Sequence, residues 1–405
     1  MVAGAGRFEC EVVVVGGGPA GLMAAVALAG ADVPTTLVAG QPRSSADNRT
    51  TALLAGSVNA LDAIGAWTRC REHAAPLRSM RIVDDTGRLW RAPEVRFDAA
   101  EIGLEAFGWN IENRHLVAAL AARVGDIPLL RIDEEASNIE IADDHVTVAL
   151  AGGGRLTSRL VVAADGRGSR CRAAAGIETD RRSYPQTALT FNLGHARPHH
   201  DISTEFHTAD GPFTLVPLPG LRSSLVWVVS PGEANHLDTL DAAELGEEIE
   251  RRAHSILGKI AVEPGHGAFP LGIETARRLA ATRIALVGEA GHVLPPIGAQ
   301  GLNLGLRDAA VVGELVVAAR RNGEDVGGPA LTDAFDRARR ADVASRSMAV
   351  DLLNRSLLSD FLPVQGARGL SLYLLDQIGP LRRAVMREGV VPRMAEPRLM
   401  RGEAL

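Results

Sequence analysis

The chain has 405 residues, 46% of them hydrophobic and 23% charged, which excludes collagen-like, fully disordered and disulfide-scaffold classes. Lys and Arg number 43 against 49 Asp and Glu, and the net charge of -6 argues against a protein that wraps nucleic acid. The three cysteines form no CxxC pair and no apolar run is long enough to span a membrane, so we expect a cytoplasmic protein.

A strand, a glycine-rich turn and a helix open the chain. Residues 11–15 are a β-branched run typical of a buried parallel strand, and residues 22–29 are rich in Ala, Leu and Met. Between them stands Gly16-x-Gly18-x-x-Gly21, in which the glycines allow a tight turn, close approach of a pyrophosphate and close helix packing. The pattern predicts dinucleotide binding, and the alternative is a plain glycine-rich turn.

The acidic residue that usually completes this motif is missing. At the end of the second predicted strand, residues 33–38, Ala39 stands where an Asp or Glu would hold the adenosine ribose. Gln41 or Arg43 could substitute for that carboxylate.

A second motif follows further elements of the same kind. Helical spacing at 57–67 and 114–124 precedes strand-like runs at 129–131, 135–141, 146–150 and 160–164. The last run leads into Asp165-Gly166, and a carboxylate at the end of a sheet strand faces the ligand crevice of an α/β fold. The alternative is that Asp165 caps a helix.

Residues 184–272 have a different hydrophobic pattern from the segments before them. Short alternating runs broken by Pro and Gly predict an antiparallel sheet, interrupted by a helix at 242–254. A buried strand returns at 283–287, followed by Glu289, a Pro/Gly loop with Pro295, and a helix that starts at Gly301-Leu302-Asn303. Such a helix start can bind an anionic ring oxygen. Residues 331–385 are mostly helical in pattern.

In this order and spacing, the motifs resemble those of the FAD-dependent aromatic-ring hydroxylases related to 4-hydroxybenzoate hydroxylase, with the best fit to the ubiquinone-biosynthesis branch. The resemblance covers most of the chain. The further segments that match this branch are Arg49-Thr-Thr-Ala-Leu-Leu, Ser57-x-x-x-Leu61-x-x-x-Gly65-x-Trp67, Glu112-Asn113-Arg114-x-Leu116, Pro212-Phe-Thr-Leu-Val-Pro217-Leu and Leu225-Val226-Trp227.

The resemblance implies an α/β fold in which a Rossmann-like FAD-binding domain is interleaved with an antiparallel-sheet substrate domain and ends in a helical C-terminus. We assign residues 8–80, 98–182 and 276–330 to the FAD-binding domain. Residues 81–97 and 183–275 form the substrate domain, and 331–405 form the C-terminal helical region.

The resemblance also implies FAD contacts, and no metal ligands. The turn would hold the pyrophosphate, Glu289 the ribityl chain, and the start of the last helix the flavin pyrimidine. Two departures soften the match, because the family usually has Asp at 289 and Gly at Ala299, where Ala limits positive φ. The full set of implied FAD residues is Gly16, Gly18, Pro19, Ala20, Gly21, Arg49, Asn113, Arg114, Asp165, Gly166, Glu289, Pro295, Gly301, Leu302 and Asn303.

The implied activity is a monooxygenase that hydroxylates a polyprenylated phenol in ubiquinone biosynthesis through a flavin C4a-hydroperoxide, with NAD(P)H as reductant and O2 as co-substrate. One alternative is a hydroxylase of a soluble aromatic compound. Another is a non-catalytic subunit of a quinone-synthesis complex, motivated by Ala39 and Glu289.

No side chain can be assigned to phenol deprotonation from the sequence. Two tyrosines, Tyr184 and Tyr373, are available, and a cluster of histidines in the substrate segment could assist, although such residues are more often solvated. Adjacent His199 and His200 would point to opposite faces of a strand, which argues against a metal site. Trp227 and Phe213 fit the core singly, and together they would suit a prenylated substrate. The histidines of the cluster are His195, His199, His200 and His207.

The charge of -6 is unevenly distributed. Residues 380–401 hold six Arg against two Glu, a local charge of +4, and follow an apolar helical stretch at 370–381. Apolar residues next to Arg suit contact with the inner face of an anionic membrane, and the alternative is a packed helix with a solvated basic tail.

Overall fold

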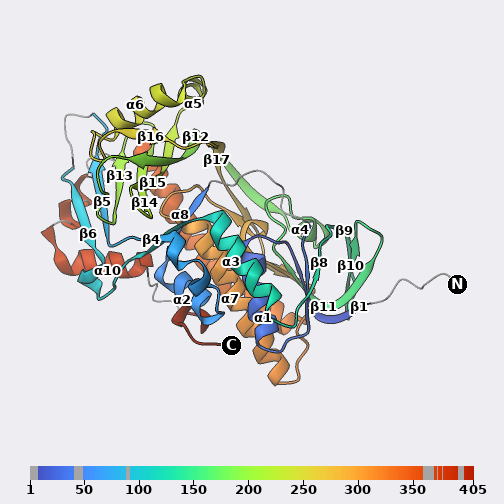
Figure 1. The fold of residues 1–405 in the computed structure, drawn as a ribbon. Coiled ribbons are helices and arrows are strands. Elements are labelled where there is room, and N and C mark those ends of the chain that lie inside the picture. The colour runs from blue at the N-terminus through green and yellow to red at the C-terminus, as the bar shows by residue number, and fades with distance from the viewer. Residues whose placement is uncertain are drawn as a thin grey trace.

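A mainly parallel sheet forms the core of the first half of the fold in this computed structural model (Figure 1). The structure describes residues 8–40, 49–87, 92–358, 369–371, 373–375, 377–390 and 396–405. The strands run in the order β18 (Ala280–Ala281), β19 (Ile284–Leu286), β11 (Arg155–Ala163), β1 (Phe8–Val15), β2 (Thr35–Val38) and β8 (Leu130–Ile132), with β10 (Val146–Leu150) and β9 (Ala136–Ile141) attached through β11.

The carboxyl ends of three central strands meet at one edge of this sheet. Parallel register sets Val15 of β1 opposite Ala163 of β11, and Ala163 opposite Leu286 of β19. The glycine-rich turn, the Asp165 turn and the Glu289 turn therefore lie side by side, as the sequence predicts for a crevice at the end of parallel strands.

Helices cover this sheet. Helix α1 (Pro19–Gly30) packs between α3 (Asn113–Gly125) and α7 (Gln300–Arg321) (Figure 1). Residues 20–29 are all buried, because α1 is apolar around its whole circumference. The described residues also form α2 (Ala55–Ala63), α4 (Arg170–Ala174), α8 (Pro329–Leu358) and α10 (Gly379–Val390), with short 3-10 turns at Trp67–Arg69, Arg71–His73, Ala99–Ile102, Gly288–Ala290 and Leu399–Arg401. Two further helices of the described residues belong to the second sheet.

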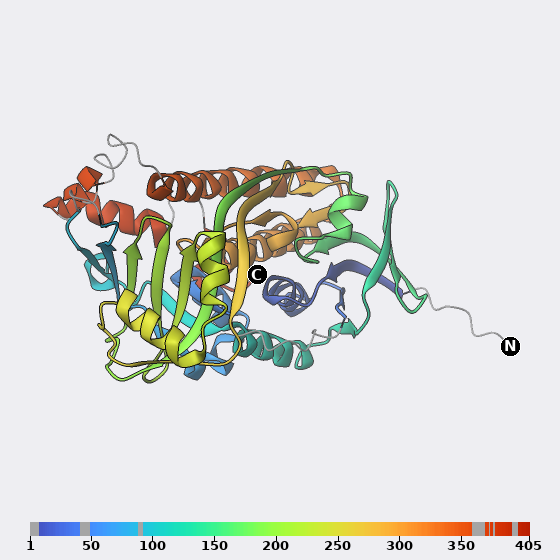
Figure 2. The ribbon, with the colours of Figure 1, turned by 90° about the horizontal axis from the view of Figure 1, so that it is seen from above.

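A second sheet, mainly antiparallel, forms the other half. Its outer face is covered by α5 (Pro231–Leu237) and α6 (Ala242–Arg252) (Figure 2). Its order is β20 (His292–Val293), β17 (Gly267–Ala276), β12 (Thr179–His195), β15 (Arg222–Val229), β14 (Pro212–Leu218), β13 (Ile202–His207), β5 (Ser79–Asp84) and β6 (Val95–Asp98), with β16 (Ile260–Val262) paired to β12. A small third sheet joins β3 (Thr50–Leu54), β7 (Gly108–Glu112) and β4 (Ala74–Pro76).

This architecture confirms the predicted fold class, including the return of the chain to the first sheet at β19. The predicted helix at 57–67 is displaced, since α2 ends at Ala63 and a 3-10 turn begins at Trp67. The strands β5 and β6 join the second sheet, in agreement with a substrate segment near 81–97, but the exact domain boundaries stay a prediction.

The last residues are not a solvated basic tail. Leu399 and Met400 are each 1% exposed and pack in the core of the first domain, where their 3-10 turn contacts α2. The backbone N–H of Arg398 donates to Glu314 of α7 at 3.0 Å. The charge pattern alone did not predict this packing. Leu399 and Met400, which stand between Arg398 and Arg401, are apolar and buried, and they hold this end of the chain against the first domain.

Candidate functional site

The three glycines of the turn after β1 have different surroundings. Gly16 has a φ of +121°, and a Cβ there would lie 2.1 Å from the carbonyl oxygen of Ala164. A Cβ on Gly21 would lie 2.2 Å from the carbonyl oxygen of Gly16. A Cβ on Gly18, the N-cap of α1, would meet no atom within 4 Å. The first and third glycines serve close packing, whereas the second leaves open space at a helix N-terminus, which fits a pyrophosphate.

Three elements converge beside this open space. Pro19 and Ala20 form the first turn of α1. A Cβ on Gly288, which follows β19, would lie 3.5 Å from the Cβ of Ala20 and 3.8 Å from the Cα of Gly305 in α7. Because no side chains separate them, the turn that carries Glu289 lies against both helices. The exposed side chain of Glu289 is free to reach a ribityl chain.

Asp165 shapes the turn after β11. Its carboxylate accepts hydrogen bonds from the Ser169 hydroxyl at 2.6 Å and the Cys171 N–H at 3.1 Å. The N-cap residue of α4 is Ser169, but Asp165 accepts from the Cys171 N–H in the first turn of that helix. The capping alternative is therefore correct for the hydrogen bond and wrong only for the N-cap position. Gly166 has a φ of +79°, which lets the chain turn there. Contact of these two residues with FAD stays a prediction.

The loop before α7 places Ala299 in a left-handed conformation. Its φ is +55°, it is the N-cap of α7, and it follows the buried Pro295 by four residues. The left-handed conformation costs an L-residue about 1–2 kcal/mol because its Cβ clashes with the backbone, and glycine, which has no Cβ, avoids this cost. The Ala for Gly departure noted in the sequence is therefore a source of strain in the loop before α7.

Replacing Ala299 by glycine should stabilise the protein by about 0.5–1 kcal/mol, since relief of strain exceeds the added freedom of the unfolded chain. Urea unfolding of the protein without cofactor measures this change. The matched control is Ala338→Gly, at an exposed position inside α8, which should destabilise by about 1 kcal/mol. Equal losses in the two variants would contradict the strain.

The Asn303 side chain holds α7 in place. Its Oδ1 accepts hydrogen bonds from the Leu54 N–H at 2.9 Å and the Ser57 hydroxyl at 2.7 Å. Its Nδ2 donates to the carbonyl oxygens of Ala52 and Ala299. The first turn of a helix leaves backbone N–H groups without intrahelical acceptors, so any flavin contact here comes from the backbone near Gly301 and Leu302. Sequence reasoning did not foresee the role of the Asn303 side chain.

Helix α7 also carries a buried acidic residue, Asp308. The carboxylate of Asp308 in α7 is fully buried and accepts from the Gly288 N–H at 2.9 Å, His292 Nε2 at 2.7 Å and Arg339 Nε at 2.6 Å. Burial alone would raise the pKa of Asp308, but the charges of Arg339 and His292 and its hydrogen bonds outweigh burial and lower it.

The same network continues along α8 to the start of α7. Arg339 donates to Asp342 at 2.7 Å, and Arg346 donates both to Asp342 at 3.0 Å and to the side-chain oxygen of Gln300 at 2.9 Å. A chain of charges thus joins the turn at Gly288 to the first residue of α7. No local sequence signal predicts the role of these α8 residues, because their pattern is that of an ordinary polar helix face.

Arg49 and Asn113 are brought together by the small third sheet. The Asn113 N–H donates to the Arg49 carbonyl oxygen at 2.9 Å, and its side-chain oxygen accepts from Thr51 at 2.7 Å. The guanidinium of Arg49 lies 5.8 Å from the centre of the Phe269 ring in β17. Both residues therefore lie where the first domain meets the second sheet.

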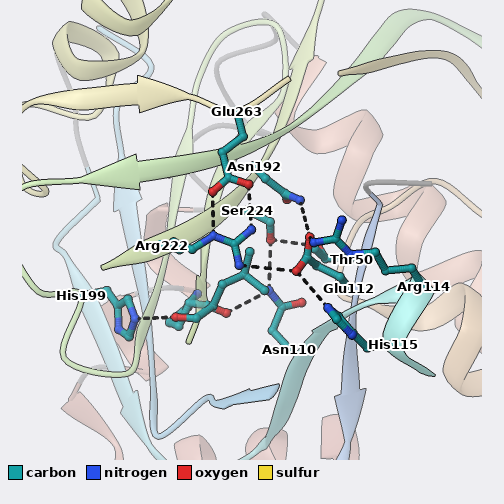
Figure 3. A network of polar contacts seen from close by, with 12 residues as sticks. Thr50, Asn110, Glu112, Arg114, His115, Asn192, His199, Arg222, Ser224 and Glu263 are labelled. Atoms are coloured by element: carbon teal, nitrogen blue, oxygen red, sulfur yellow. Dashed lines mark hydrogen bonds and ion pairs between the residues drawn. The ribbon is translucent and has the colours of Figure 1, made fainter. Parts of the chain in front are cut away.

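A buried carboxylate next to Asn113 joins the two domains (Figure 3). Glu112, whose side chain is 4% exposed, accepts from Arg114 at 2.8 Å, Asn192 at 3.1 Å and Arg222 at 3.4 Å. Arg222 also pairs with Glu263, and these carboxylates raise its pKa. The guanidinium of Arg114 is thus held by Glu112, and its FAD contact stays a prediction. The sequence motif included Glu112 but gave no signal of this role.

The four histidines of the cluster have different surroundings. Both ring nitrogens of His195 and of His199 have hydrogen-bond partners, and His200 is exposed. The Nε2–H of His207 donates to the Glu205 carboxylate at 2.8 Å, and its Nδ1 is buried without a partner among the described residues. A histidine role in phenol ionisation therefore narrows to His207 and stays a prediction.

The two tyrosines have different surroundings. Tyr184 donates its hydroxyl to Asp351 of α8 at 2.6 Å, and burial together with this carboxylate raises the pKa of the phenol. Tyr373 is 51% exposed beside α10. Within the described part of the chain, no group of three or more His, Cys, Asp or Glu is arranged to hold a metal ion.

Trp227 and Phe213 are core residues, and the idea that they form a substrate face is wrong. Their rings are 5.3 Å apart, and they pack beneath α6 on the outer face of the second sheet. Alternation along the strands puts Thr190, Val226 and Thr214 on the opposite face, where they are cross-strand neighbours and half-buried. That inner face lies toward the first domain, where Asn110 donates to Ser224, and contact of this wall with a substrate stays a prediction.

Comparisons with known proteins agree with this geometry. A family model described as FAD binding domain matches residues 9–349. The chain is 34% identical to the ubiquinone hydroxylase UbiL of Rhodospirillum rubrum, over 100% of this chain and 95% of that protein. It is 30% identical to the 3-demethoxyubiquinol 3-hydroxylase of Escherichia coli, over 93% and 97%.

Solved structures share the fold. The p-nitrophenol 4-monooxygenase PnpA of Pseudomonas putida has a TM-score of 0.79 at 19% identity, over 96% of this chain and 100% of that chain. HpxO of Klebsiella pneumoniae, complexed with FAD and uric acid, has a TM-score of 0.74 at 19% identity, over 96% and 98%.

Proposed function

This chain belongs to the FAD-binding-domain family and is an FAD-dependent monooxygenase, and from that premise we propose that it hydroxylates a polyprenylated phenol in ubiquinone biosynthesis. The observation that carries the proposal is the extent of similarity to two ubiquinone hydroxylases. It spans both sheets and the helical C-terminus, and so includes the wall that would contact a substrate.

The residues present fit FAD. Open space over Gly18 at the start of α1 suits the pyrophosphate, and the exposed Glu289 suits the ribityl chain. The start of α7 offers backbone donors and a positive dipole end to an anionic flavin ring. When bound, FAD carries electrons from NAD(P)H and activates O2. The protein positions the phenol against the inner face near Val226 and keeps water out.

Anaerobic reduction of the purified protein by NADPH or NADH, followed by oxygen, tests this function. We expect a short-chain prenylated phenol to accelerate flavin reduction and to be recovered with one added hydroxyl group. Stimulation and hydroxylation with a non-prenylated phenol alone would instead indicate a soluble aromatic substrate. A protein that binds no flavin would indicate the non-catalytic subunit of a quinone-synthesis complex.

We also propose that the protein works at the cytoplasmic face of a membrane, where such substrates reside. No helix in the described ranges is long and apolar enough to cross a bilayer. Large apolar side chains with exposures above a third gather at the end of α8 and in and before α10. They are Met348, Leu352, Leu353, Leu370, Tyr373, Ile378, Leu381 and Val385.

The charge of α10 favours a lipid partner for this surface, since the helix holds three Arg against one Glu. Ile378, Leu381 and Val385 share one helical face, and Arg383 and the exposed Arg387 lie on the opposite side of the same helix. Exposed apolar residues on a basic helix suit an interface with anionic headgroups. The surface, rather than the anchored 398–405 segment, is therefore the proposed contact.

Changing Leu381 and Val385 together to glutamate should reduce binding to vesicles containing about 30% phosphatidylglycerol at least tenfold, since it removes apolar area and adds repulsion. Co-sedimentation measures binding, and the flavin content should stay unchanged. The control changes to glutamate the exposed Leu130, which begins β8, and the exposed Leu221, which lies between β14 and β15. Equal loss in both double variants would contradict a specific surface.

A further inference from the structure

The adenosine half of FAD lacks its usual carboxylate, because Ala39 stands at the end of β2. Ala39 is 4% exposed, and its Cβ lies 2.9 Å from the position that a Cβ on Gly17 would take. Its methyl group is thus directly against the glycine-rich turn but accepts no hydrogen bond. Gln41 and Arg43, named above as substitutes, lie outside the described residues.

The neighbouring strand ends at the same edge. β2 and β8 pair in parallel with Val38 opposite Ile132, and the Ala39 N–H donates to the Ile132 carbonyl oxygen at 3.0 Å. Since parallel strands present their carboxyl ends together, the residues after β8 lie beside those after β2. Glu135 follows Ile132 by three residues.

Gly40 leaves room for the Glu135 side chain. A Cβ on Gly40 would lie 2.9 Å from Glu135 Cγ and 3.7 Å from its Oε1. The backbone at this point is fixed, because the Glu135 carbonyl oxygen accepts from the Ala151 N–H at 2.9 Å. The exposed side chain of Glu135 therefore lies against Gly40, the residue that follows Ala39 beyond the end of β2.

We propose that Glu135 replaces the missing carboxylate of β2 and binds the 2′- and 3′-hydroxyls of the adenosine ribose of FAD. A carboxylate can accept both hydrogen bonds of a vicinal diol, and charge-assisted bonds of this kind are the strong ones. The proposal rests on FAD binding by the family fold and not on the phenol proposed as substrate.

The sign of one substitution separates this role from a plain charge effect. Near a pyrophosphate, a carboxylate that makes no hydrogen bond only repels, so its removal would tighten FAD binding. A carboxylate that holds the diol has the opposite effect. Glu135→Gln keeps the shape of the side chain and removes the charge.

We expect Glu135→Gln to raise the dissociation constant for FAD about tenfold, measured by flavin fluorescence in titrations of the protein stripped of cofactor. The control is Glu134→Gln, which removes the same charge one residue earlier. The Glu134 carboxylate accepts instead from the Gly152 N–H, at 2.6 Å. This control should bind FAD within a factor of two of the parent protein.

A double substitution that moves the carboxylate from Glu135 to position 39 provides the second test. Adding Ala39→Glu to Glu135→Gln restores a carboxylate at the usual position, and FAD affinity should return toward the parent value. Ala39→Asp serves if the longer side chain disturbs folding, as judged by thermal unfolding. Unchanged or tighter binding in Glu135→Gln overturns the proposal, as does a loss matched by Glu134→Gln. No phenol is present, so the outcome is independent of the proposed substrate.

Discussion

Replacing Gly18 by valine should remove FAD binding and leave the fold intact. The residue has extended backbone angles, φ -74° and ψ 170°, which valine adopts readily, and its Cβ would meet no protein atom within 4 Å. The added isopropyl group would instead fill the space at the start of α1 that fits the pyrophosphate. We expect at least a thousandfold weaker FAD binding, because both the phosphate approach and the helix N–H donors are blocked.

The glycine two residues earlier gives the contrasting result. Gly16→Val forces a β-branched residue to a φ of +121°, with its Cβ 2.1 Å from the Ala164 carbonyl oxygen. This change should unfold the first domain. Flavin absorbance of the purified protein and thermal unfolding of the cofactor-free form separate the two variants. A Gly18→Val protein that stays yellow would contradict the placement of the pyrophosphate.

Features encoded locally could be predicted from the sequence. The turn from Gly16 to Gly21, the Asp165 turn and the Glu289 turn each follow a short apolar strand, and parallel pairing places them at one edge. Local pattern plus the rule for open α/β sheets is enough for that result.

Features that depend on distant partners could not be predicted. Glu112 meets Arg222 across 110 residues, and Asp308 meets Arg339 across 31. Neither pair has a periodic signal, since each residue alone reads as a surface charge. The misassigned Trp227 shows the same limit. Its alternation correctly predicts a buried face, but only the position of α6 tells which side of the sheet that face occupies.

Replacing Arg339 by methionine should destabilise the protein by about 3–5 kcal/mol. Its guanidinium is 3% exposed and lies between the carboxylates of Asp308 and Asp342. Methionine matches the length of the aliphatic part but leaves the buried Asp308 carboxylate with the Gly288 N–H and His292 as its partners, and removing one member of a buried ion pair is costly. Urea unfolding of the cofactor-free protein measures the loss. The control is Arg340→Met on the same helix, which is 55% exposed and 3.7 Å from Asp336, and should cost less than about 1 kcal/mol.

The dependence on pH gives an independent test of the same cluster. The pKa of Asp308 is lowered mainly by Arg339, against the effect of burial, and that of Asp342 is lowered in the same way. A carboxyl whose pKa is depressed on folding contributes stability above its unfolded value of about 3.9 and loses it as the pH falls below that value. The parent protein should therefore lose stability steeply on acidification below about pH 4. Arg339→Met should lose less over the same range, because its carboxylates are no longer held ionised. Parallel pH profiles for the two proteins would show that Arg339 does not stabilise these charges.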